Sequence, residues 1–366
     1  MSTIASPRQI LGLFLFIFLF LYYDINNIWL KTISDSKGSR LFITDWKLAQ
    51  EDQAMVHMKD QCLVEDIKFT RPEGSSTIYE HVICPTIAAT HPKFICNKSS
   101  TFSYALLAME DFIHFLEDKN FTILYVGDSL QEQMYHAFLC AVEAEEALVA
   151  QKDQQVTLLL ERSKRRVQYS ASYFLARLPP ECIVTRPKFN VTSLQNEDWF
   201  QVATRQSVTH IVFNTGAWFT PSGIHIHNRK ATREQTRLCF ERHLVPGSRL
   251  YYLLHVLSEQ YNIEMIWRDV SPAGICNTKT HQLEESKYTN YYNDFQYYNK
   301  IGRNVTVNLL KGLVVPDVYE TSMKYWREHM SASDTMHWCS FMTYNVPSVW
   351  NTKLFQLLLS QTKPDV

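Results

Sequence analysis

The stretch from Phe121 to Phe138, FTILYVGDSLQEQMYHAF, most constrains how this chain can fold. Its apolar run over residues 121–126 has no polar alternation and stops at Gly127, a pattern typical of a buried strand. Beyond Ser129 the apolar residues recur at three- and four-residue spacing, which predicts a helix. The free backbone N–H groups and positive dipole end of that helix would favour a developing oxyanion at Ser129. The alternative is that Asp128 or Ser129 only caps the helix.

A serine nucleophile needs a base that takes its proton and a third group that orients the base. The segment Asp334-Thr335-Met336-His337 supplies a candidate pair, because an acid and a histidine three residues apart can meet on one turn. The alternative is a solvated acid near a structural histidine. The order of the two motifs, with the serine early and Asp-x-x-His close to the C-terminus, predicts a triad of Ser129, His337 and Asp334.

Four further blocks resemble those of the PC-esterase family, in particular the trichome birefringence-like polysaccharide O-acetyltransferases. The blocks are Cys84-Pro85 with Cys96 downstream, Phe213–Phe219, Trp267–Pro272, and His337–Cys339 with Val346–Asn351 beyond it. Together these blocks cover residues 62–360. The resemblance implies an SGNH-hydrolase-like three-layer α/β/α sandwich with a mostly parallel sheet, and an O-acyltransferase or serine esterase activity.

The resemblance also implies catalytic roles for single residues. Ser129 would attack the acyl carbonyl, His337 would take and return the proton, and Asp334 would orient His337. The backbone N–H of Ser129 and the side chain of Asn214 would stabilise the oxyanion, with Gly216 in the same loop. The alternative for Asn214 is a turn-forming Asn-x-Gly sequence.

Substrate binding is expected at three positions close to these motifs, namely Asp128, Trp218 and Arg268. A cation at Arg268, directly after an apolar segment, could hold a substrate or an acyl donor. The alternative is that Arg268 pairs with Asp269 or with another carboxylate.

The sequence departs from the family pattern next to these positions. The family's serine motif usually continues with an arginine and an asparagine, whereas this chain has Gln131, Glu132 and Gln133. Ala217 stands where the NTG block usually has a histidine. No glycine lies between residues 128 and 215, so the second oxyanion donor is unassigned.

Short apolar segments alternate with helical ones along the chain. Strands are predicted at residues 121–126, 167–178, 209–213, 263–267 and 312–315, and helices at 102–119, 131–163, 198–205 and 348–359. This alternation indicates an α/β fold with parallel strands. The loop after strand 209–213, which contains Asn214, would then lie beside Ser129 at the carboxyl edge of the sheet.

Composition limits the choice of partners. The chain has 366 residues, is 46% hydrophobic and carries a formal net charge of -1, so a nucleic-acid partner is not expected. We expect a polysaccharide or glycan acceptor. No bound cofactor is expected, the acyl donor is unidentified although the resemblance favours an acetyl donor, and the oligomeric state is open.

The N-terminus carries an apolar run from Ile10 to Tyr23. No small-x-small cleavage site follows it, so an uncleaved signal anchor is favoured over a cleaved signal peptide. The predicted organisation is a cytosolic tail and anchor in residues 1–30, a stem in 31–60, a cysteine-rich lobe in 61–100 and a catalytic domain in 101–366. The expected location is the Golgi membrane, as a single-pass type II protein with a lumenal catalytic domain.

Cysteine usage fits a lumenal location, because an oxidising compartment would pair an even set. The eight cysteines are Cys62, Cys84, Cys96, Cys140, Cys182, Cys239, Cys276 and Cys339. Their connectivity is open, with Cys96–Cys339 and Cys84–Cys140 as the preferred pairs; no Cys-x-x-Cys occurs, so a zinc site is not expected. N-glycosylation is expected at Asn97, Asn190 and Asn304, whereas the sequon at Asn120 abuts the central strand and is expected to be unmodified.

These observations favour a carbohydrate O-acetyltransferase that uses a serine acyl-enzyme. A carbohydrate O-acetyl esterase of the same fold is the first alternative, because transfer and hydrolysis share the acyl-enzyme. A catalytically silent glycan-binding protein is the second. A covalent serine probe separates the enzyme hypotheses from the silent one, since only the former require labelling of Ser129.

Overall fold

The computed structural model describes residues 109–152, 159–184, 195–221, 224–226, 229–273, 275–277, 282–284, 292–325, 336–338 and 345–361. The predicted anchor, stem and cysteine-rich lobe lie outside these residues, as do Asp334, Cys339, Asn97 and Asn190. Within the described part, no helix is both long and apolar enough to cross a membrane.

A five-stranded parallel sheet forms the centre of the fold, in the order β10-β7-β4-β1-β2. Its strands are β1 (Ile123–Gly127), β2 (Val167–Ala171), β4 (His210–Phe213), β7 (Glu264–Trp267) and β10 (Leu313–Val314). The chain leaves β1 for β2 on one side and later returns to add β4 on the other side. The carboxyl ends of β1 and β4 therefore flank a topological switch point, where open α/β sheets place their ligand sites.

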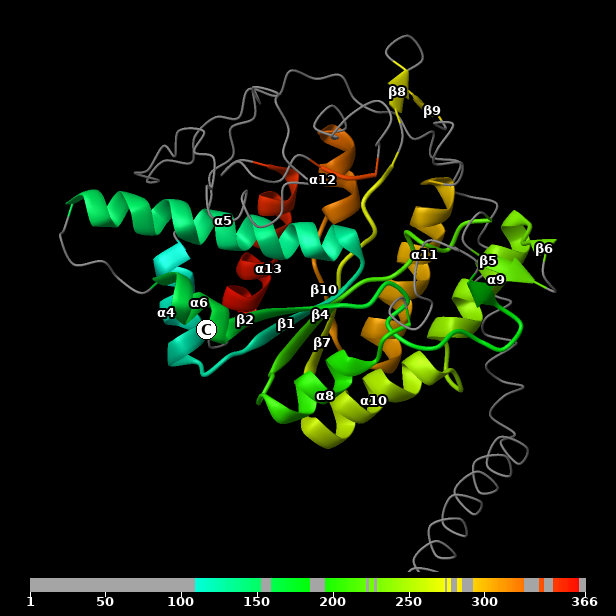
Figure 1. Ribbon diagram of the computed structural model, residues 1–366, viewed down its shortest axis with the longest axis horizontal. Coiled ribbons are helices and arrows are strands. Elements are labelled where there is room, and N and C mark those ends of the chain that lie inside the picture. Colours follow the sequence, from blue (N-terminus) through cyan, green and yellow to red (C-terminus); the bar gives the residue numbers. More distant parts are fainter. Residues whose placement is uncertain are drawn as a thin grey trace, which may run out of the picture. The chain divides into compact units, whose positions relative to one another are not determined.

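Helices cover both faces of this sheet (Figure 1). On one face α5 (Ser129–Lys152) packs against α13 (Val346–Gln361), with α4 (Met109–Asp118), α6 (Leu159–Arg166) and α12 (Val318–Lys324) beside them. On the other face lie α8 (Asp198–Arg205), α9 (Arg233–Leu244), α10 (Arg249–Tyr261) and α11 (Tyr292–Asn304), and α11 continues into the π-helical turn η3 (Val305–Leu309). The described chain is thus an α/β fold with a parallel sheet between two helical layers.

Two small antiparallel sheets accompany the main one. The first has the order β3-β5-β6, from β3 (Ile183–Val184), β5 (Ile224–Ile226) and β6 (Arg229–Lys230). The second pairs β8 (Ile275–Asn277) with β9 (Gln282–Glu284).

The strands of the main sheet are apolar because both of their faces are covered. All residues of β1 and β4 are buried, and Trp267 at the end of β7 is fully enclosed. Two glycines let α11 and the start of β10 approach β7 closely. A Cβ at Gly302 would lie 2.3 Å from the Trp267 ring, and one at Gly312 would lie 2.1 Å from the Met265 carbonyl oxygen. Side chains at these two positions would displace α11 or β10 from the sheet.

The element predictions hold with two differences. Strands were expected at the positions of β1, β4, β7 and β10, and all four are present. The expected strand over residues 167–178 ends at Ala171, because the chain bends over residues 173–176 and Leu175 adopts a left-handed backbone conformation with φ 62°. The expected helix over residues 131–163 is two helices: α5 ends at Lys152 and α6 begins at Leu159.

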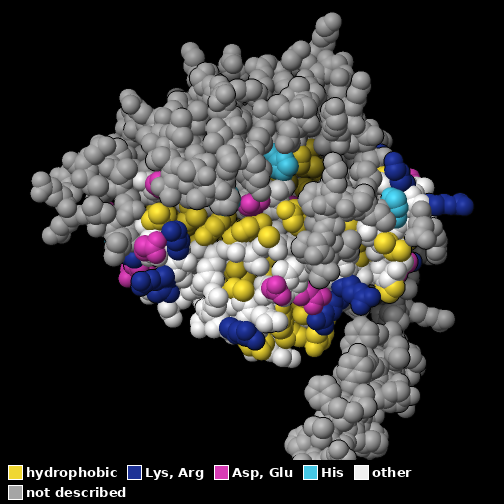
Figure 2. Space-filling model, in the orientation of Figure 1, with side chains coloured by type: hydrophobic (Ala, Val, Ile, Leu, Met, Phe, Trp, Pro, Cys, Tyr) yellow, Lys and Arg dark blue, Asp and Glu magenta, His cyan; other side chains and the backbone are white. Residues whose placement is uncertain are grey.

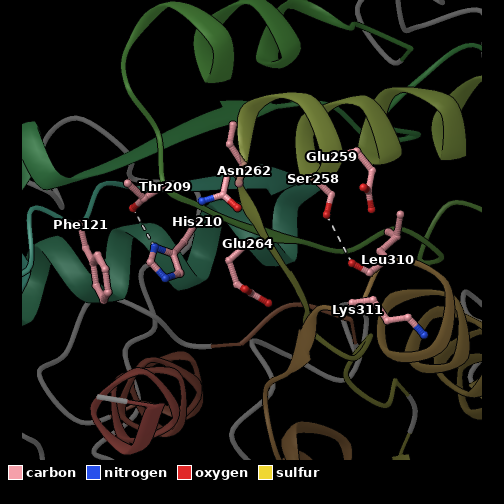
Figure 3. A pocket seen from close by; sticks show the side chains of 10 residues that line it. Phe121, Thr209, His210, Ser258, Glu259, Asn262, Glu264, Leu310 and Lys311 are labelled. Carbon is pink, nitrogen blue, oxygen red and sulfur yellow. Dashed lines mark hydrogen bonds between the residues drawn. The ribbon is translucent and has the colours of Figure 1, made fainter. Parts of the chain in front are cut away.

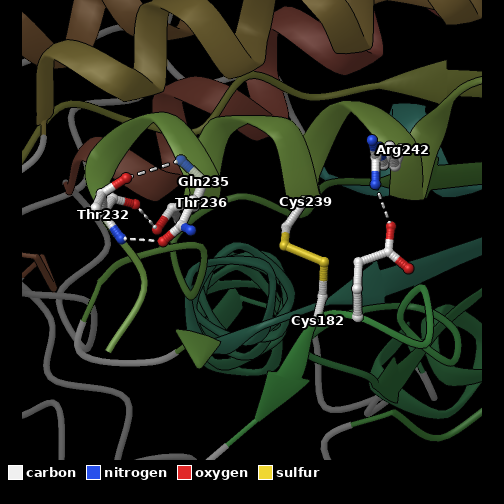
Figure 4. The surroundings of a disulfide bond; sticks show 7 residues. Cys182, Thr232, Gln235, Thr236, Cys239 and Arg242 are labelled. Carbon is white, nitrogen blue, oxygen red and sulfur yellow. Dashed lines mark hydrogen bonds and ion pairs between the residues drawn. A yellow bond between two sulfur atoms is a disulfide. The ribbon is translucent and has the colours of Figure 1, made fainter. Parts of the chain in front are cut away.

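A disulfide joins Cys182 to Cys239 (Figure 4). It connects the segment before β3 to the middle of α9, whose N-terminus is fixed by a capping box between Thr232 and Gln235. Cys140 is also disulfide-bonded, and its partner lies outside the described side chains. The preferred pairs Cys84–Cys140 and Cys96–Cys339 therefore stay predictions.

Two sequons lie within the described residues, and both of their asparagines are exposed. The Asn120 side chain accepts a hydrogen bond from Arg166, 2.9 Å away, and the Asn304 side chain accepts one from Asn308, 2.7 Å away. Exposure and local pairing do not separate the two sites, so the expectation that only Asn304 is glycosylated stays a prediction.

Candidate active site

The predicted nucleophile is the first residue of α5, directly after β1. Asp128 is fully buried, and its Oδ1 accepts a hydrogen bond of 2.9 Å from the backbone N–H of Leu130. Asp128 therefore caps this helix start, whereas the side chain of Ser129 is partly exposed. The substrate-binding role of Asp128 stays a prediction. Burial raises the pKa of Asp128, and the positive charge of Arg268 partly opposes that rise.

The structure brings Ser129 and His337 together from positions 208 residues apart. The Oγ of Ser129 lies 2.7 Å from the Nε2 of His337, so the hydroxyl can donate its proton to an unprotonated Nε2. The two sequence motifs predicted that these side chains would meet; the roles of Ser129 as nucleophile and His337 as base stay predictions. Asp334 lies outside the described residues, so its role as the orienting acid stays a prediction.

A side chain that sequence reasoning missed holds the segment that carries His337. Gln133, one helical turn after Ser129, donates from Nε2 to the Trp338 carbonyl at 2.6 Å and accepts from the Trp338 N–H at 3.2 Å. The Trp338 indole donates to the Oγ of Ser271 at 3.2 Å. The nucleophile helix thus fixes the backbone next to the base, and the only signal in the sequence was an amide on the same helical face as the serine.

Asn214 follows β4 and lies against the nucleophile turn. A Cβ at Gly127 would lie 2.7 Å from the Oδ1 of Asn214, so only glycine permits this approach. Asn214 is fully buried, and within the described part of the chain neither its Oδ1 nor its Nδ2 has a hydrogen-bond partner. An unpaired buried amide costs about 1–3 kcal/mol, which a ligand at this position would recover.

The backbone of the loop that contains Asn214 requires a glycine at position 216. Its φ is +141°, a region that other residues rarely adopt, and a Cβ there would lie 2.9 Å from the Val270 side chain. Thr215, between the two predicted oxyanion residues, donates from Oγ1 to the Tyr173 carbonyl at 3.1 Å. The loop is therefore fixed in place at the carboxyl edge, and the donor roles of Asn214 and Gly216 stay predictions.

Arg268 is fully buried, and its hydrogen bonds are internal. Its Nε donates to the Oε1 of Gln131 at 2.6 Å and its Nη1 to the Asp269 carbonyl at 2.9 Å, while the guanidinium lies 4.9 Å from the Trp350 ring centre. The expected alternative partner, the Asp269 carboxylate, instead pairs with Arg303. Burial lowers the pKa of Arg268 to about 10, so the group stays charged, and its substrate-binding role stays a prediction.

The segment 172–178, which we call the β2 loop, connects the catalytic blocks and was not foreseen. The Ser172 N–H donates to the Gly127 carbonyl at 2.9 Å. Two buried side chains, His243 and Trp199, donate to the carbonyls of Phe174 and Leu175, each at 2.5 Å. These contacts hold Leu175 in a left-handed conformation that costs on the order of 1–3 kcal/mol, as is common where a fold fixes a functional loop.

Comparison with known families identifies the fold around this site. Residues 107–357, more than half of the chain, match PC-Esterase, described as the GDSL/SGNH-like Acyl-Esterase family found in Pmr5 and Cas1p. The protein belongs to the PC-esterase family. No curated protein matches the sequence.

The catalytic blocks of this PC-esterase meet in one place. The Gly127-Asp128-Ser129 turn, the Asn214 loop, Ser271 and Trp338 are connected by the contacts above. The Trp338 and Trp350 rings pack edge to face with centroids 6.2 Å apart, and Tyr125 in β1 donates to Asn351 at 2.8 Å. The blocks that fall on described residues are therefore packed against one another, whereas Cys84, Pro85 and Cys96 lie outside those residues.

Trp218 lies near this site with its ring partly exposed. Its ring packs edge to face with that of Tyr173, with centroids 4.8 Å apart. On the face shown in Figure 2, described hydrophobic side chains form a band across the middle of the surface, with acidic, basic and histidine side chains beside it. The substrate-binding role of Trp218 stays a prediction.

A cavity lies at the opposite, amino edge of the sheet (Figure 3). Its volume is about 530 Å³, and its walls include Phe121, His210, Asn262, Glu264 and Lys311. These residues lie at the starts of strands or in the loops before them, away from Ser129. Within the described ranges, no group of three or more His, Cys, Asp or Glu side chains could hold a metal ion there or elsewhere.

Proposed function

We propose that this PC-esterase is a carbohydrate O-acetyltransferase that acts through an acyl-Ser129 intermediate. The observation that carries the proposal is the 2.7 Å contact between Ser129 Oγ and His337 Nε2 at the N-terminus of α5. A serine with a base already in contact and a helix dipole behind it has the arrangement that acyl transfer needs. Membership of a GDSL/SGNH-like acyl-esterase family supports the same chemistry.

The reaction runs in two halves. Ser129 Oγ attacks the carbonyl carbon of the acyl donor, and its proton passes to His337 Nε2, which Asp334 would orient. The tetrahedral intermediate collapses, and the donor's leaving group departs with the proton from His337. An acceptor hydroxyl then attacks the acyl-serine and gives its proton to His337, which returns it to Ser129 as the ester of the acceptor leaves.

The oxyanion formed in each half needs hydrogen-bond donors. We assign these to the backbone N–H of Ser129, at the positive end of α5, and to the Nδ2 of Asn214. The Asn214 amide is buried without a partner in the described residues, so its donor is available to a developing charge. The role of Gly216 is to give the loop the backbone shape that presents Asn214.

We place the enzyme in the Golgi membrane, anchored by residues 10–23 with the catalytic domain in the lumen. The apolar run and the even set of cysteines support this location. The Cys182–Cys239 disulfide is in keeping with an oxidising compartment. The trichome birefringence-like subfamily and a polysaccharide or glycan acceptor are part of the same proposal.

The test uses the purified full chain in detergent, with a fluorophosphonate probe and peptide mapping. We expect the probe to label Ser129 in the wild type and to leave Ser129→Ala unlabelled. In a second step, an acetyl ester donor is supplied with and without a neutral oligosaccharide, and acetylated product is measured by mass spectrometry. Transfer to sugar supports the proposal; release of acetate alone would make the protein an esterase, and no labelling would make it a silent glycan-binding protein.

A further inference from the structure

Two side chains that no step of the proposed reaction uses connect the carboxyl ends of β4 and β7 to the start of α5. The first is Gln131, two residues after Ser129 on α5, and the second is Arg268, directly after β7. Both side chains are fully buried. Their contacts lie inside the fold, directly behind the residues that would hold the reacting atoms.

Gln131 connects the nucleophile helix to β4. Its Nε2 donates to the Val212 carbonyl at 3.2 Å, two residues before Asn214. A Cβ at Gly127 would lie 2.8 Å from the Cβ of Gln131 and 2.7 Å from the Oδ1 of Asn214. The first turn of α5, the turn before Ser129 and the Asn214 loop are therefore packed together, and the Gln131 amide supplies a hydrogen bond between α5 and β4.

Arg268 determines which way the Gln131 amide faces. The Nε of Arg268 donates to the Oε1 of Gln131 at 2.6 Å. Since a guanidinium donates and cannot accept, Oε1 has to face Arg268, and Nε2 is then left to face the Val212 carbonyl. Without Arg268 the amide can turn over and set Oε1 against that carbonyl, two acceptors with no proton between them. Arg268 thus keeps Gln131 in the orientation that binds β4.

The Arg268 guanidinium is itself held from several sides. The backbone N–H of Arg268 donates to the Phe213 carbonyl at 3.0 Å, and its Nη1 donates to the Asp269 carbonyl at 2.9 Å. The guanidinium lies 4.9 Å from the Trp350 ring centre. Its Nη2 has no partner among the described residues, so a substrate-binding role would have to act through this buried atom.

We propose that Arg268 is a positioning residue, which acts through Gln131 to set the separation of Ser129 and Asn214 and does not bind substrate. The inference rests on the proposed acyl transfer and concerns the same site. The oxyanion has to lie within hydrogen-bond reach of the Ser129 N–H on α5 and of the Asn214 amide after β4. A displacement of about 1 Å between these two elements can cost on the order of a hundredfold in rate.

The main experiment measures kcat and KM with an acetyl ester donor for wild type, Arg268→Met and Gln131→Met. Methionine is apolar and flexible, and replacing a buried charge by an apolar side chain often leaves a fold intact. We expect Arg268→Met to lower kcat about tenfold to a hundredfold, with KM for donor and acceptor within about twofold of wild type. Gln131→Met should lower kcat by a similar factor, and the double variant should be no slower than the slower single one. A rise in KM with an unchanged kcat in Arg268→Met would make the residue a substrate binder and overturn the proposal.

A conservative variant tests the orientation argument. An ammonium also donates without accepting, so Arg268→Lys should keep the Gln131 amide facing β4. We expect Arg268→Lys to recover most of the lost turnover, to within about fivefold of wild type. A lysine variant as slow as Arg268→Met would contradict the orientation argument.

The matched control is Arg303→Met at the same strand end. Arg303 lies on α11, and its Nε donates to the carboxylate of Asp269, the neighbour of Arg268, at 2.9 Å. Its loss leaves a buried carboxylate without this partner, so the melting temperature should fall, whereas kcat of the folded protein should stay within about threefold of wild type. If Arg303→Met lowered kcat as much as Arg268→Met, the effect would be one of stability and the positioning role would be rejected.

Hydrogen–deuterium exchange separates failure of this inference from failure of the proposed function, because it needs no activity. Arg268→Met should raise the exchange rate about tenfold in the peptides that contain Ser129 and Asn214, and Arg303→Met should leave these peptides unchanged. Faster exchange in a protein that shows neither labelling nor transfer would retain the support of these segments by Arg268 and reject the enzyme. Transfer by wild type with an unchanged kcat in Arg268→Met would retain the enzyme and reject the positioning role.

Discussion

The two edges of the parallel sheet differ in the state of their buried polar groups. At the carboxyl edge, Asn214 and Arg268 are fully buried, and each has a polar atom without a partner in the described chain. At the amino edge there is a cavity of about 530 Å³, but the buried polar atoms of its described walls are all paired. Thr209, for example, contacts His210 at 2.7 Å and accepts from the Thr122 N–H at 2.9 Å.

This difference shows that the volume of a cavity and the presence of unpaired buried polar groups are separate properties of a region. A fold maintains an unpaired buried amide at a cost in stability, and such a cost is retained where a ligand or a transition state recovers it. An open cavity with paired walls carries no comparable cost. This contrast supports the proposal that the reaction takes place at the carboxyl edge.

The largest expected effect is the loss of the nucleophile or its base. Ser129→Ala and His337→Ala should each lower kcat by roughly four to six orders of magnitude, because the pair acts as one unit. The double variant should be no worse than either single one. Steady-state rates with an acetyl ester donor test this, with His210→Gln at the amino edge as the control. A double variant far below both single variants would show that the two residues act independently.

The next effect concerns the unpaired amide. Asn214→Asp keeps the turn chemistry but replaces an N–H donor with a negative charge, so we expect kcat to fall by roughly a hundredfold or more. A residue that only shaped the turn would change stability and leave the turnover of the folded protein unchanged. Thermal melting measured beside kcat distinguishes the two roles, and near-native turnover would leave the oxyanion to backbone donors alone.

A smaller effect is expected where the base is positioned from a distance. Gln133→Leu removes both hydrogen bonds to the Trp338 backbone, and we expect about a tenfold to hundredfold loss in kcat with little change in KM. Gln133→Glu retains an acceptor for the Trp338 N–H but sets a buried carboxylate oxygen against the Trp338 carbonyl, so it should lose at least as much. Fluorophosphonate labelling at several pH values provides a second readout, because a displaced base changes the pH profile of Ser129 reactivity. If the pH profile of Ser129 labelling is unchanged in Gln133→Leu, the hydrogen bonds between Gln133 and Trp338 contribute only to stability.

These three sites also mark what the sequence could predict. Ser129 and Asn214 each follow an apolar strand, so parallel topology predicted that they lie together. The pairing of Ser129 with His337 was predicted from the order of two short motifs and from the family resemblance. The contact between Gln133 and Trp338 spans 205 residues, and no local pattern encodes such a pair. Leu175 has a backbone conformation that its side chain disfavours, and only its tertiary contacts explain where the predicted strand stops.

Acid should weaken the fold through one histidine at each edge. Burial lowers the pKa values of His210 and His243 from 6.5 to about 4. An unfolded chain takes up protons below pH 6.5 that the folded chain binds only near pH 4, so the free energy of unfolding should fall as the pH falls through this window, by up to roughly 3 kcal/mol per histidine. Denaturant titrations of His210→Gln and His243→Gln should each show a flatter acid limb.

Substitution of the same two histidines should also affect kcat differently at the two edges of the sheet. His243 donates to the Phe174 carbonyl in the β2 loop, so His243→Gln should also lower kcat several-fold, whereas His210→Gln should not. A flatter acid limb in both variants with loss of kcat in only one would support the contrast between the edges. Equal loss of kcat in both would connect the amino edge to catalysis.

The smallest effect is expected at the wall of the amino-edge cavity. Glu264 is half-buried, and burial raises its pKa because it disfavours the charged form. Glu264→Gln removes that charge; since the group is partly solvated, the gain in the free energy of unfolding should stay below about 1 kcal/mol. We expect kcat to stay within about twofold of wild type, because nothing at this cavity touches the reacting atoms. The informative comparison is Asp128→Asn, which replaces a fully buried carboxyl group beside Ser129 and should alter turnover. If Glu264→Gln lowered kcat as much as Asp128→Asn did, the amino-edge cavity would be coupled to the reaction, and paired walls would no longer distinguish a passive cavity from a functional one.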